Sequence, residues 1–173
     1  MRRRRTITVV VLRGCETTPV TGLILLTLTA LLLGVLACGQ ESAPDKSDPA
    51  AYAQHLVSQA MERYQKDGFE NTVAYLNSDA GKDGEWYVFM VHSGGELLAT
   101  ADQELVGENM NGDLGTDPSG YNFWLDMRDT TSQGKWLSYT FLNPETREQQ
   151  PKHSWVARDG DLFFGSGWYE GIK

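Results

Sequence analysis

The first part of the predicted folded region carries apolar residues at helical spacing. Asp48 is a suitable N-cap acceptor, and Pro49 suits the first turn of a helix. The apolar or small residues that follow are three or four positions apart: Ala53, Leu56, Val57, Ala60, Met61 and Tyr64. This spacing predicts an amphipathic helix that ends at Gly68 and buries one face. A second, shorter helix is predicted over residues 69–76.

From residue 85 onward the period of the apolar residues falls to two. One face of the predicted strand carries Trp86, Val88 and Met90, and the other carries Tyr87, Phe89 and Val91. Because both faces are apolar, the strand is expected to be buried on both sides. The run Ser93-Gly94-Gly95 predicts a tight hairpin, and residues 96–100 are expected to return as a second strand.

The remainder of the chain predicts a loop, a short helix and three more strands. Residues 102–120 are rich in Gly, Asp and Asn and are expected to be loop, whereas residues 121–131 carry a helical apolar stripe. Strands are predicted over residues 136–142, 152–158 and 162–169. Short connections require antiparallel neighbours. The predicted fold class is therefore α+β: a long N-terminal helix packed on a five-stranded antiparallel sheet, with a helix and loop segment that covers it.

The first 37 residues have the order of an export signal. Arg2–Arg5 and Arg13 are positively charged, Leu23–Leu36 is an apolar run, and Ala37-Cys38 is a small-residue cleavage point. The residues around Cys38 resemble the bacterial lipobox. This resemblance implies that the mature chain begins at Cys38, that its thiol carries lipid, and that the domain lies outside the cytoplasm on a periplasmic or cell-surface membrane face.

An uncleaved membrane anchor is the alternative for this leader. No residue between Glu16 and Glu41 is charged, and about 20 apolar residues span a bilayer. Both interpretations place the following domain outside the cytoplasm. We expect residues 1–37 to be the signal peptide, 38–47 a flexible polar tether and 48–173 a single domain.

Removal of the leader makes the remaining chain strongly acidic. The 136 residues left contain ten basic and 22 acidic side chains, a formal charge of −12. Such a chain repels nucleic acid, so we expect no nucleic-acid partner. Cys15 lies in the leader and Cys38 at the tether, so the domain itself contains no cysteine. Disulfides and thiolate metal sites are therefore excluded within it.

No residue pattern predicts a metal site or a catalytic set. His55, His92 and His153 lack metal-ligand spacing, and the acidic residues of loop 102–117 do not match an EF-hand. Gly165-Ser166-Gly167 lies in a predicted strand instead of the strand-to-helix turn of a nucleophile elbow. We therefore expect no metal, no cofactor and no enzymatic activity.

Aromatic side chains with polar tips are common in the predicted sheet and its covering segment. Such side chains can wall an apolar pocket and still offer hydrogen bonds. Alternation places Tyr139 and Trp136 on opposite faces of one strand, and Lys152 and Trp155 on opposite faces of the next. The register between these strands is not determined by the sequence, so Tyr139 can lie beside either Lys152 or Trp155.

Several short motifs occur in a characteristic order. They are Trp86-Tyr87-Val88-Phe89, Gly95-Glu96-Leu97-Leu98-Ala99, Leu105-Val106-Gly107, Gly134-Lys135-Trp136-Leu137-Ser138-Tyr139, Lys152-His153-Ser154-Trp155-Val156 and Phe164-Gly165-Ser166-Gly167-Trp168-Tyr169. In this order the chain resembles the single Cache domain, a PAS-like extracellular sensor family of bacterial receptors, over about residues 48–170.

The resemblance implies a small-molecule ligand, such as a carboxylate, amino acid or amine, held between the sheet and the covering segment. Residues expected to line or support this site are Trp86, Phe89, Trp124, Arg128, Trp136, Tyr139, Lys152, Trp155 and Trp168. Tyr139 and Lys152 would orient polar groups, and the aromatic rings would enclose a cavity of metabolite size. Thr100-Ala101 stands where relatives often carry His-Pro, which removes one possible contact to a ligand carboxylate.

These observations predict a membrane-tethered, non-catalytic sensor module. Because the sequence ends at Lys173 without an output domain, we expect it to act through a separate receptor or kinase partner, or to deliver its ligand. The alternative is an accessory envelope lipoprotein that binds another protein and fills its pocket with its own side chains.

Overall fold

The computed structural model describes residues 42–171, which contain three α-helices and one antiparallel sheet. The helices are α1 (Pro49–Asp67), α2 (Phe69–Leu76) and α3 (Phe123–Arg128). The strands are β1 (Lys82–Asp83), β2 (Trp86–His92), β3 (Leu97–Ala99), β4 (Lys135–Leu142), β5 (Gln149–Asp159) and β6 (Leu162–Tyr169). Short 3₁₀ turns lie at Asp79–Gly81, Gln103–Leu105 and Asp113–Gly115. The predicted signal peptide and the lipidation site Cys38 lie outside the described residues.

Side-chain caps mark the starts of α1 and α3, and backbone caps mark the helix ends. The carboxylate of Asp48 accepts a hydrogen bond from the backbone N–H of Ala51 (3.0 Å), and Gly68 ends α1 with a φ of 81°. The second helix spans the predicted residues 69–76. Helix α3 is shorter than predicted because the Asn122 side chain caps its start and Asp129 ends it.

The sheet has six strands, not the predicted five. Strand β1 has only two residues, too few for period two to reveal it in the sequence, and it pairs with the start of β2. The strand order is β1-β2-β6-β5-β4, with β3 also paired to β2. Between β4 and β5 the register places Tyr139 opposite Lys152 and Trp136 opposite Trp155. The alternation predicted from the sequence is therefore confirmed, and the open question of register is answered.

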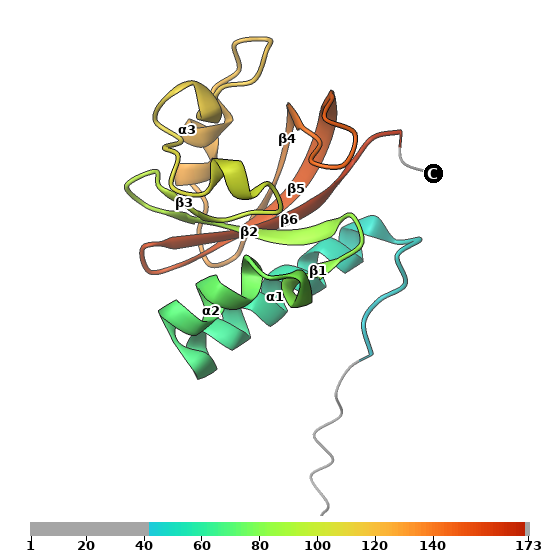
Figure 1. Cartoon of the computed structure of the whole chain (residues 1–173), viewed down its shortest axis with the longest axis vertical. Helices are drawn as coiled ribbons and strands as arrows, with labels where there is room; N and C mark the ends of the chain where they lie inside the picture. Colours follow the sequence, from blue (N-terminus) through green and yellow to red (C-terminus); the bar gives the residue numbers. More distant parts are fainter. Residues whose placement is uncertain (1–41, 172–173) are drawn as a thin grey trace, which may run out of the picture. The chain divides into compact units, whose positions relative to one another are not determined.

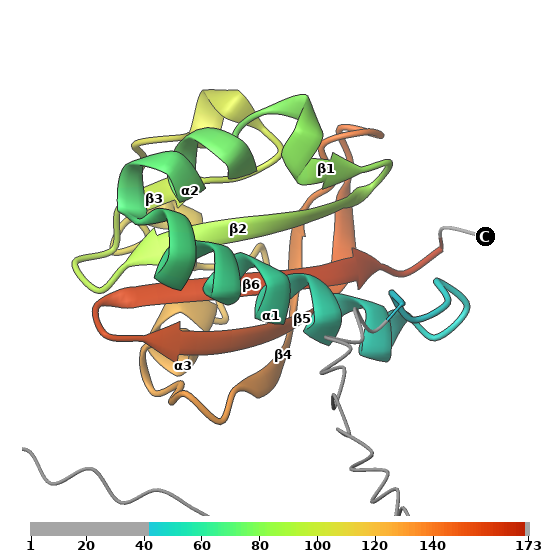
Figure 2. The same ribbon diagram turned by 90° about the horizontal axis from the view of Figure 1, so that it is seen from below.

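Two layers cover the sheet, one on each face. Helices α1 and α2 lie together on one face, and α3 with the loops after β3 lies on the other (Figure 1). Figure 2 shows α1 running across the sheet on the side of α2. One core lies beneath the helices and includes Val57, Ala60, Met90 and Phe164. The other lies beneath α3 and includes Phe89, Phe123, Trp124 and Tyr139.

Within residues 42–171, none of the helices combines the length and the apolar character that crossing a membrane requires.

Candidate functional site

A small internal cavity lies between the sheet and the segment that contains α3. Its volume is about 20 Å³, enough for about one water molecule. The residues that line it are Tyr87, Phe89, Val91, Leu97, Thr100, Met110, Phe123, Met127, Tyr139, Phe141 and Lys152. The cavity lies where the resemblance implied, but it is far smaller than the metabolite-sized hollow that we expected, because Phe123 and Tyr139 stack with their ring centroids 4.1 Å apart.

Lys152 is the only charged residue in the lining of this cavity. It lies on β5 and is 2% exposed. Its Nζ donates to the hydroxyl of Tyr87 (2.6 Å) and to that of Tyr169 (3.3 Å). Among residues 42–171, no carboxylate forms an ion pair with it. An amine that is buried without an opposite charge is costly, and a bound anion would remove that cost.

Aromatic rings surround the Lys152 amine. Its Nζ lies 4.3 Å from the ring centroid of Tyr87, 4.7 Å from that of Tyr169, 5.5 Å from that of Phe89 and 5.8 Å from that of Phe141. Cation–π attraction within about 6 Å partly compensates a buried charge. The rings hold the amine in place, but they offer no counter-charge.

Two buried phenols keep their protons: Tyr169, which contacts the amine, and Tyr139, which lines the cavity. Burial, followed by the neighbouring phenol of Tyr87, raises the pKa of Tyr169 well above its usual range. Burial also raises the pKa of Tyr139 above its usual range. The Tyr169 hydroxyl donates to the carbonyl of Leu142 (3.0 Å), and the hydroxyls of Tyr139 and Ser154 lie 3.0 Å apart. At neutral pH the site therefore combines an amine with uncharged phenols, which is a suitable lining for an anion.

The structure brings three of the predicted site residues together at the cavity: Phe89, Tyr139 and Lys152. Trp124 lies on the same side of the sheet but packs in the core, where its ring meets Phe163 edge to face. The Trp124 Nε1 donates to Asn111 Oδ1 (3.0 Å). Trp124 therefore supports the covering segment and is not among the residues that line the cavity.

The other four predicted tryptophans lie on the opposite face of the sheet. Trp86 packs edge to face against Tyr52 of α1. Trp136 contacts Trp155 and Trp168, with ring centroids 5.3 and 5.5 Å away. Alternation carries these side chains away from the cavity, since Trp86, Trp136 and Trp155 each have the opposite parity to a cavity residue on their own strand. Trp168 has the opposite parity to Tyr169, which contacts Lys152. Arg128 is exposed on α3 and lines a separate surface hollow with Arg158.

Sequence reasoning missed several residues of the site, above all Tyr87 and Tyr169. The sequence could have indicated Tyr87, because it lies two positions before Phe89 on β2 and therefore points to the same face of the sheet. Tyr169 could not be assigned in this way, since its contact with Lys152 depends on the register of β5 with β6, in which these two residues are partners.

Asp117 anchors the covering loop to β4. Its carboxylate accepts hydrogen bonds from the Ser119 hydroxyl (2.5 Å), from the backbone N–H groups of Ser119 and Tyr121 (2.9 and 3.1 Å), and from the backbone N–H of Thr140 (3.2 Å). These hydrogen bonds, the Ser119 hydroxyl first, lower the pKa of Asp117 below its usual value. The carboxylate thereby fixes the loop to β4 next to Tyr139 and Phe141, which line the cavity.

This anchor predicts a specific acid sensitivity. Because the folded-state pKa of Asp117 is lower than the unfolded value, its contribution to stability is present above pH 4 or so and is lost as the pH falls through the folded pKa. We expect Asp117→Asn to reduce the dependence of unfolding free energy on pH in this acidic range. Urea unfolding between neutral pH and strong acid measures the effect. Asp113→Asn, an exposed change in the same loop, is the control, and an equal change in both variants would contradict the assignment.

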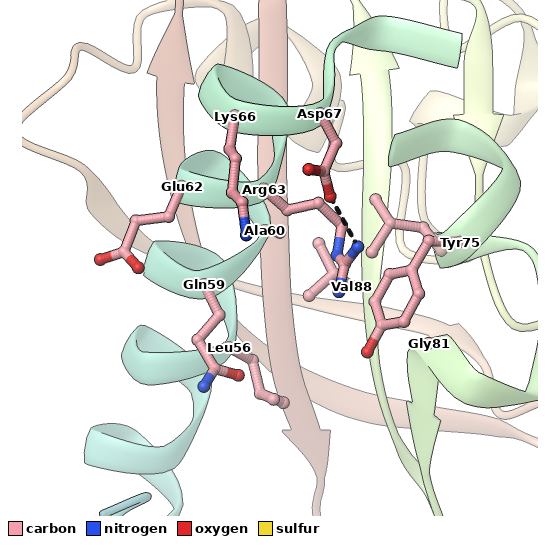
Figure 3. Close-up of a pocket in the computed structure, with 11 residues that line it drawn as sticks. Leu56, Gln59, Ala60, Glu62, Arg63, Lys66, Asp67, Tyr75, Gly81 and Val88 are labelled. Atoms are coloured by element: carbon pink, nitrogen blue, oxygen red, sulfur yellow. Dashed lines mark hydrogen bonds and ion pairs between the residues drawn. The ribbon is translucent and has the colours of Figure 1, made fainter. Parts of the chain in front are cut away.

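A groove between α1 and α2 is larger but chemically less suited to capture a ligand. Its volume is about 420 Å³. The guanidinium of Arg63 lies over the ring of Tyr75, 3.7 Å from its centroid, and donates to Asp67 (2.9 Å), as Figure 3 shows. Its principal cation is thus already paired at the surface. Lys66 and Glu62 also line the groove, but both are exposed to solvent. The groove therefore offers no buried charge for a ligand to satisfy.

A serine, a histidine and a glutamate form a hydrogen-bonded chain on the outer face of the sheet. Ser138 Oγ lies 2.8 Å from His153 Nδ1, and His153 Nε2 lies 2.7 Å from Glu170 Oε1. In the Ser-His-Asp arrangement the serine meets Nε2 and the acid meets Nδ1, so the ring nitrogens are exchanged here. Ser138 is also exposed in the middle of a strand. We interpret the chain as a surface network. Residues 42–171 hold no group of three or more acidic, histidine or cysteine side chains placed to bind a metal ion.

Three solved structures resemble this fold. The methyl-accepting chemotaxis protein of Vibrio parahaemolyticus is 22% identical, with a TM-score of 0.57 over 73% of this chain and 88% of that chain. A periplasmic sensor domain of a chemotaxis protein is 19% identical, with a TM-score of 0.53 over 68% of this chain and 87% of that one. A Cache chemosensory domain described for carboxylic acid recognition is 14% identical, with a TM-score of 0.55 over 68% and 90%.

No protein-family model matches the chain, and no curated protein matches it significantly in sequence. At the identities of the solved structures the likeness concerns the fold. The domain formed by residues 42–171 therefore has the PAS-like α+β fold of a single Cache sensor domain.

Proposed function

We propose that this domain is a non-catalytic sensor that binds a small carboxylate at the Lys152 cavity. The observation that carries the proposal is the Lys152 amine, which is 2% exposed and has no carboxylate partner among the described residues. A carboxylate is the complementary group, because it accepts charge-assisted hydrogen bonds from the amine. The structural likeness to a Cache domain described for carboxylic acid recognition supports the same ligand class.

Lys152 would supply the contact to a ligand carboxylate that is lost where Thr100-Ala101 replaces His-Pro. Relatives with His-Pro at that position have an imidazole after the second strand, whereas here Thr100 is one of the cavity residues. The proposed cationic contact comes instead from Lys152 on β5. Lys152 therefore favours a carboxylate over the amine that the resemblance also allowed, because an amine ligand would be repelled.

The proposed setting is the outer side of a membrane. The lipobox-like residues around Cys38 support a lipid anchor, and the tether would place the domain close to the membrane surface. Ligand binding beneath the covering segment would favour one arrangement of that segment over another. A separate receptor or kinase would then bind or respond to the altered covering segment. Alternatively, the domain would deliver its ligand to a separate partner.

The small volume of the cavity favours the alternative function, an accessory lipoprotein with no small-molecule ligand. About 20 Å³ is less than a metabolite occupies, so any ligand has to displace side chains. In the alternative, the hydrogen bonds to Tyr87 and Tyr169 and the cation–π contacts are enough to hold Lys152. Exposed residues such as Trp136, which is 38% exposed, then meet a protein partner.

Thermal unfolding distinguishes these two functions. We expect short monocarboxylates to raise the melting temperature by about 5–10 °C at about 100 times the dissociation constant, since a ligand that binds only the native state stabilises it. The matched neutral amides and primary amines, at equal ionic strength, are expected to have no effect. An unchanged melting temperature across all carboxylates would reject the sensor proposal and favour the accessory role.

A further inference from the structure

The cavity that contains Lys152 has a larger neighbour on the far side of one aromatic ring. An apolar surface groove of about 300 Å³ lies between the end of β4 and the loop around Asp117. It is lined by Leu105, Asp113, Leu114, Thr116, Asp117, Pro118, Thr140, Phe141, Leu142 and Gln149. Phe141 is the one residue that also lines the inner cavity. Its side chain therefore forms the partition between the two spaces.

The contacts of Phe141 locate its ring at this boundary. Its ring centroid lies 6.0 Å from that of Phe123 and 6.1 Å from that of Tyr139, both edge to face, and Lys152 Nζ lies 5.8 Å from it. The side chain is only partly buried, unlike the Phe123 and Tyr139 rings that it meets. One side of the ring thus faces the amine, while the other borders the groove.

Hydrogen bonds fix the backbone on both sides of Phe141, whereas its ring is only partly buried. The Tyr169 hydroxyl donates to the carbonyl of Leu142 (3.0 Å), and the N–H of Thr140 donates to Asp117 (3.2 Å). Phe141 also has a β5 partner, Gln150, in the ladder. Displacement at this point therefore requires a change of side-chain rotamer and no movement of the strand.

The inner cavity and the outer groove are lined by side chains of opposite charge. The inner cavity contains Lys152, whereas the groove has the carboxylates of Asp113 and Asp117 among apolar side chains such as Leu105 and Leu114. A carboxylate head is attracted to the first space and repelled by the second. A hydrocarbon chain attached to that head suits the apolar part of the groove.

We propose that Phe141 determines the chain length of the carboxylate that this domain binds, an inference that rests on the proposed function. With the Phe141 ring in place, the site accepts only the shortest carboxylates, which displace other side chains of the lining. A longer carboxylate binds with its head at Lys152 and its chain in the groove only when the ring is displaced, and this displacement weakens its apparent affinity.

Calorimetric titration of acetate and hexanoate into the wild-type protein and Phe141→Ala tests this proposal. We expect wild type to favour acetate and the variant to shift the ratio of the two dissociation constants toward hexanoate by about tenfold or more. Phe69→Ala is the matched control, because it removes the same ring from an exposed position (44%) on α2, on the other face of the sheet. Its ratio is expected to equal that of wild type. Phe141→Leu is used if the alanine variant does not fold, and the same direction of change is expected.

A neutral probe separates failure of this inference from failure of the proposed function. Removal of the ring joins the two spaces whether or not Lys152 binds anions, so 1-hexanol is expected to bind Phe141→Ala and not the wild type. Hexanol binding to the variant, with no carboxylate binding to either protein, supports the partition and rejects the anion site. Carboxylate binding with an unchanged chain-length preference, or no hexanol binding to the variant, overturns the role of Phe141.

Discussion

Replacement of Lys152 by methionine is expected to abolish carboxylate binding while the domain stays folded. The loss of one partner from a buried, hydrogen-bonded charge pair costs about 2–5 kcal/mol, so the affinity is expected to fall by a factor of about 30 or more. Methionine has a similar length and is apolar, which suits the rings of Tyr87, Phe89 and Phe141 around this position. Isothermal titration with acetate measures the change.

The same substitution is expected to stabilise the ligand-free domain. It removes an amine that is buried without an opposite charge, and we expect a gain of about 1–3 kcal/mol in the free energy of unfolding. Lys66→Met on the exposed surface of α1 is the control, since it changes the net charge equally without touching the cavity. Undiminished acetate binding by Lys152→Met would reject the assigned site. A large loss of stability would show that Lys152 is a structural residue.

Replacement of Trp124 by alanine is expected to destabilise the domain by about 3–5 kcal/mol, the usual cost of removing a large buried aromatic side chain. Trp124 is 1% exposed and packs edge to face on Phe163. Its indole N–H also donates a hydrogen bond to the side-chain oxygen of Asn111. The side-chain amide of Asn111 in turn donates to the carbonyl of Gly94 in the β2–β3 hairpin (2.7 Å). Loss of this ring would therefore loosen the covering segment from the sheet. Urea-induced unfolding measures the effect.

Trp136→Ala provides the comparison for this prediction. Trp136 is 38% exposed at the surface of the opposite face, and we expect its removal to cost about 1 kcal/mol. Trp124→Phe is expected to recover a large part of the lost stability and to leave carboxylate affinity unchanged, because Trp124 does not line the cavity. Equal destabilisation by the two alanine variants would contradict the distinction between the faces. Impaired carboxylate binding by Trp124→Phe would show that Trp124 contributes to the ligand site.

The long periodic segments of the fold were predictable because their side chains repeat. The three- and four-residue spacing before Gly68 predicted α1, and the alternation in residues 86–91 predicted the two buried faces of β2; both are confirmed. Strand β1 was missed, since two residues establish no period. The predicted helix over 121–131 is confirmed only in its centre, because the side chain of Asn122 sets the first turn of α3.

The candidate site was predicted only in part, and strand parity explains the difference. Trp86 and Phe89 are three positions apart on one strand, so they cannot point to the same face. The same is true of Trp136 and Tyr139, and parity could have divided the predicted residues into two groups from the sequence alone. It could not indicate which group faces the cavity, because that depends on the face that each helix covers.

The sequence by itself determined the elements and the face of each side chain within a strand, because both follow from local periodicity along the chain. Only the tertiary structure decided that Lys152 is paired with Tyr139 across one ladder and with Tyr169 across the other. Register and layer order arise from contacts between distant segments, which local spacing does not encode. The same contacts decided that stacked rings reduce the hollow beside Lys152 to about 20 Å³ and that Phe141 separates it from the outer groove.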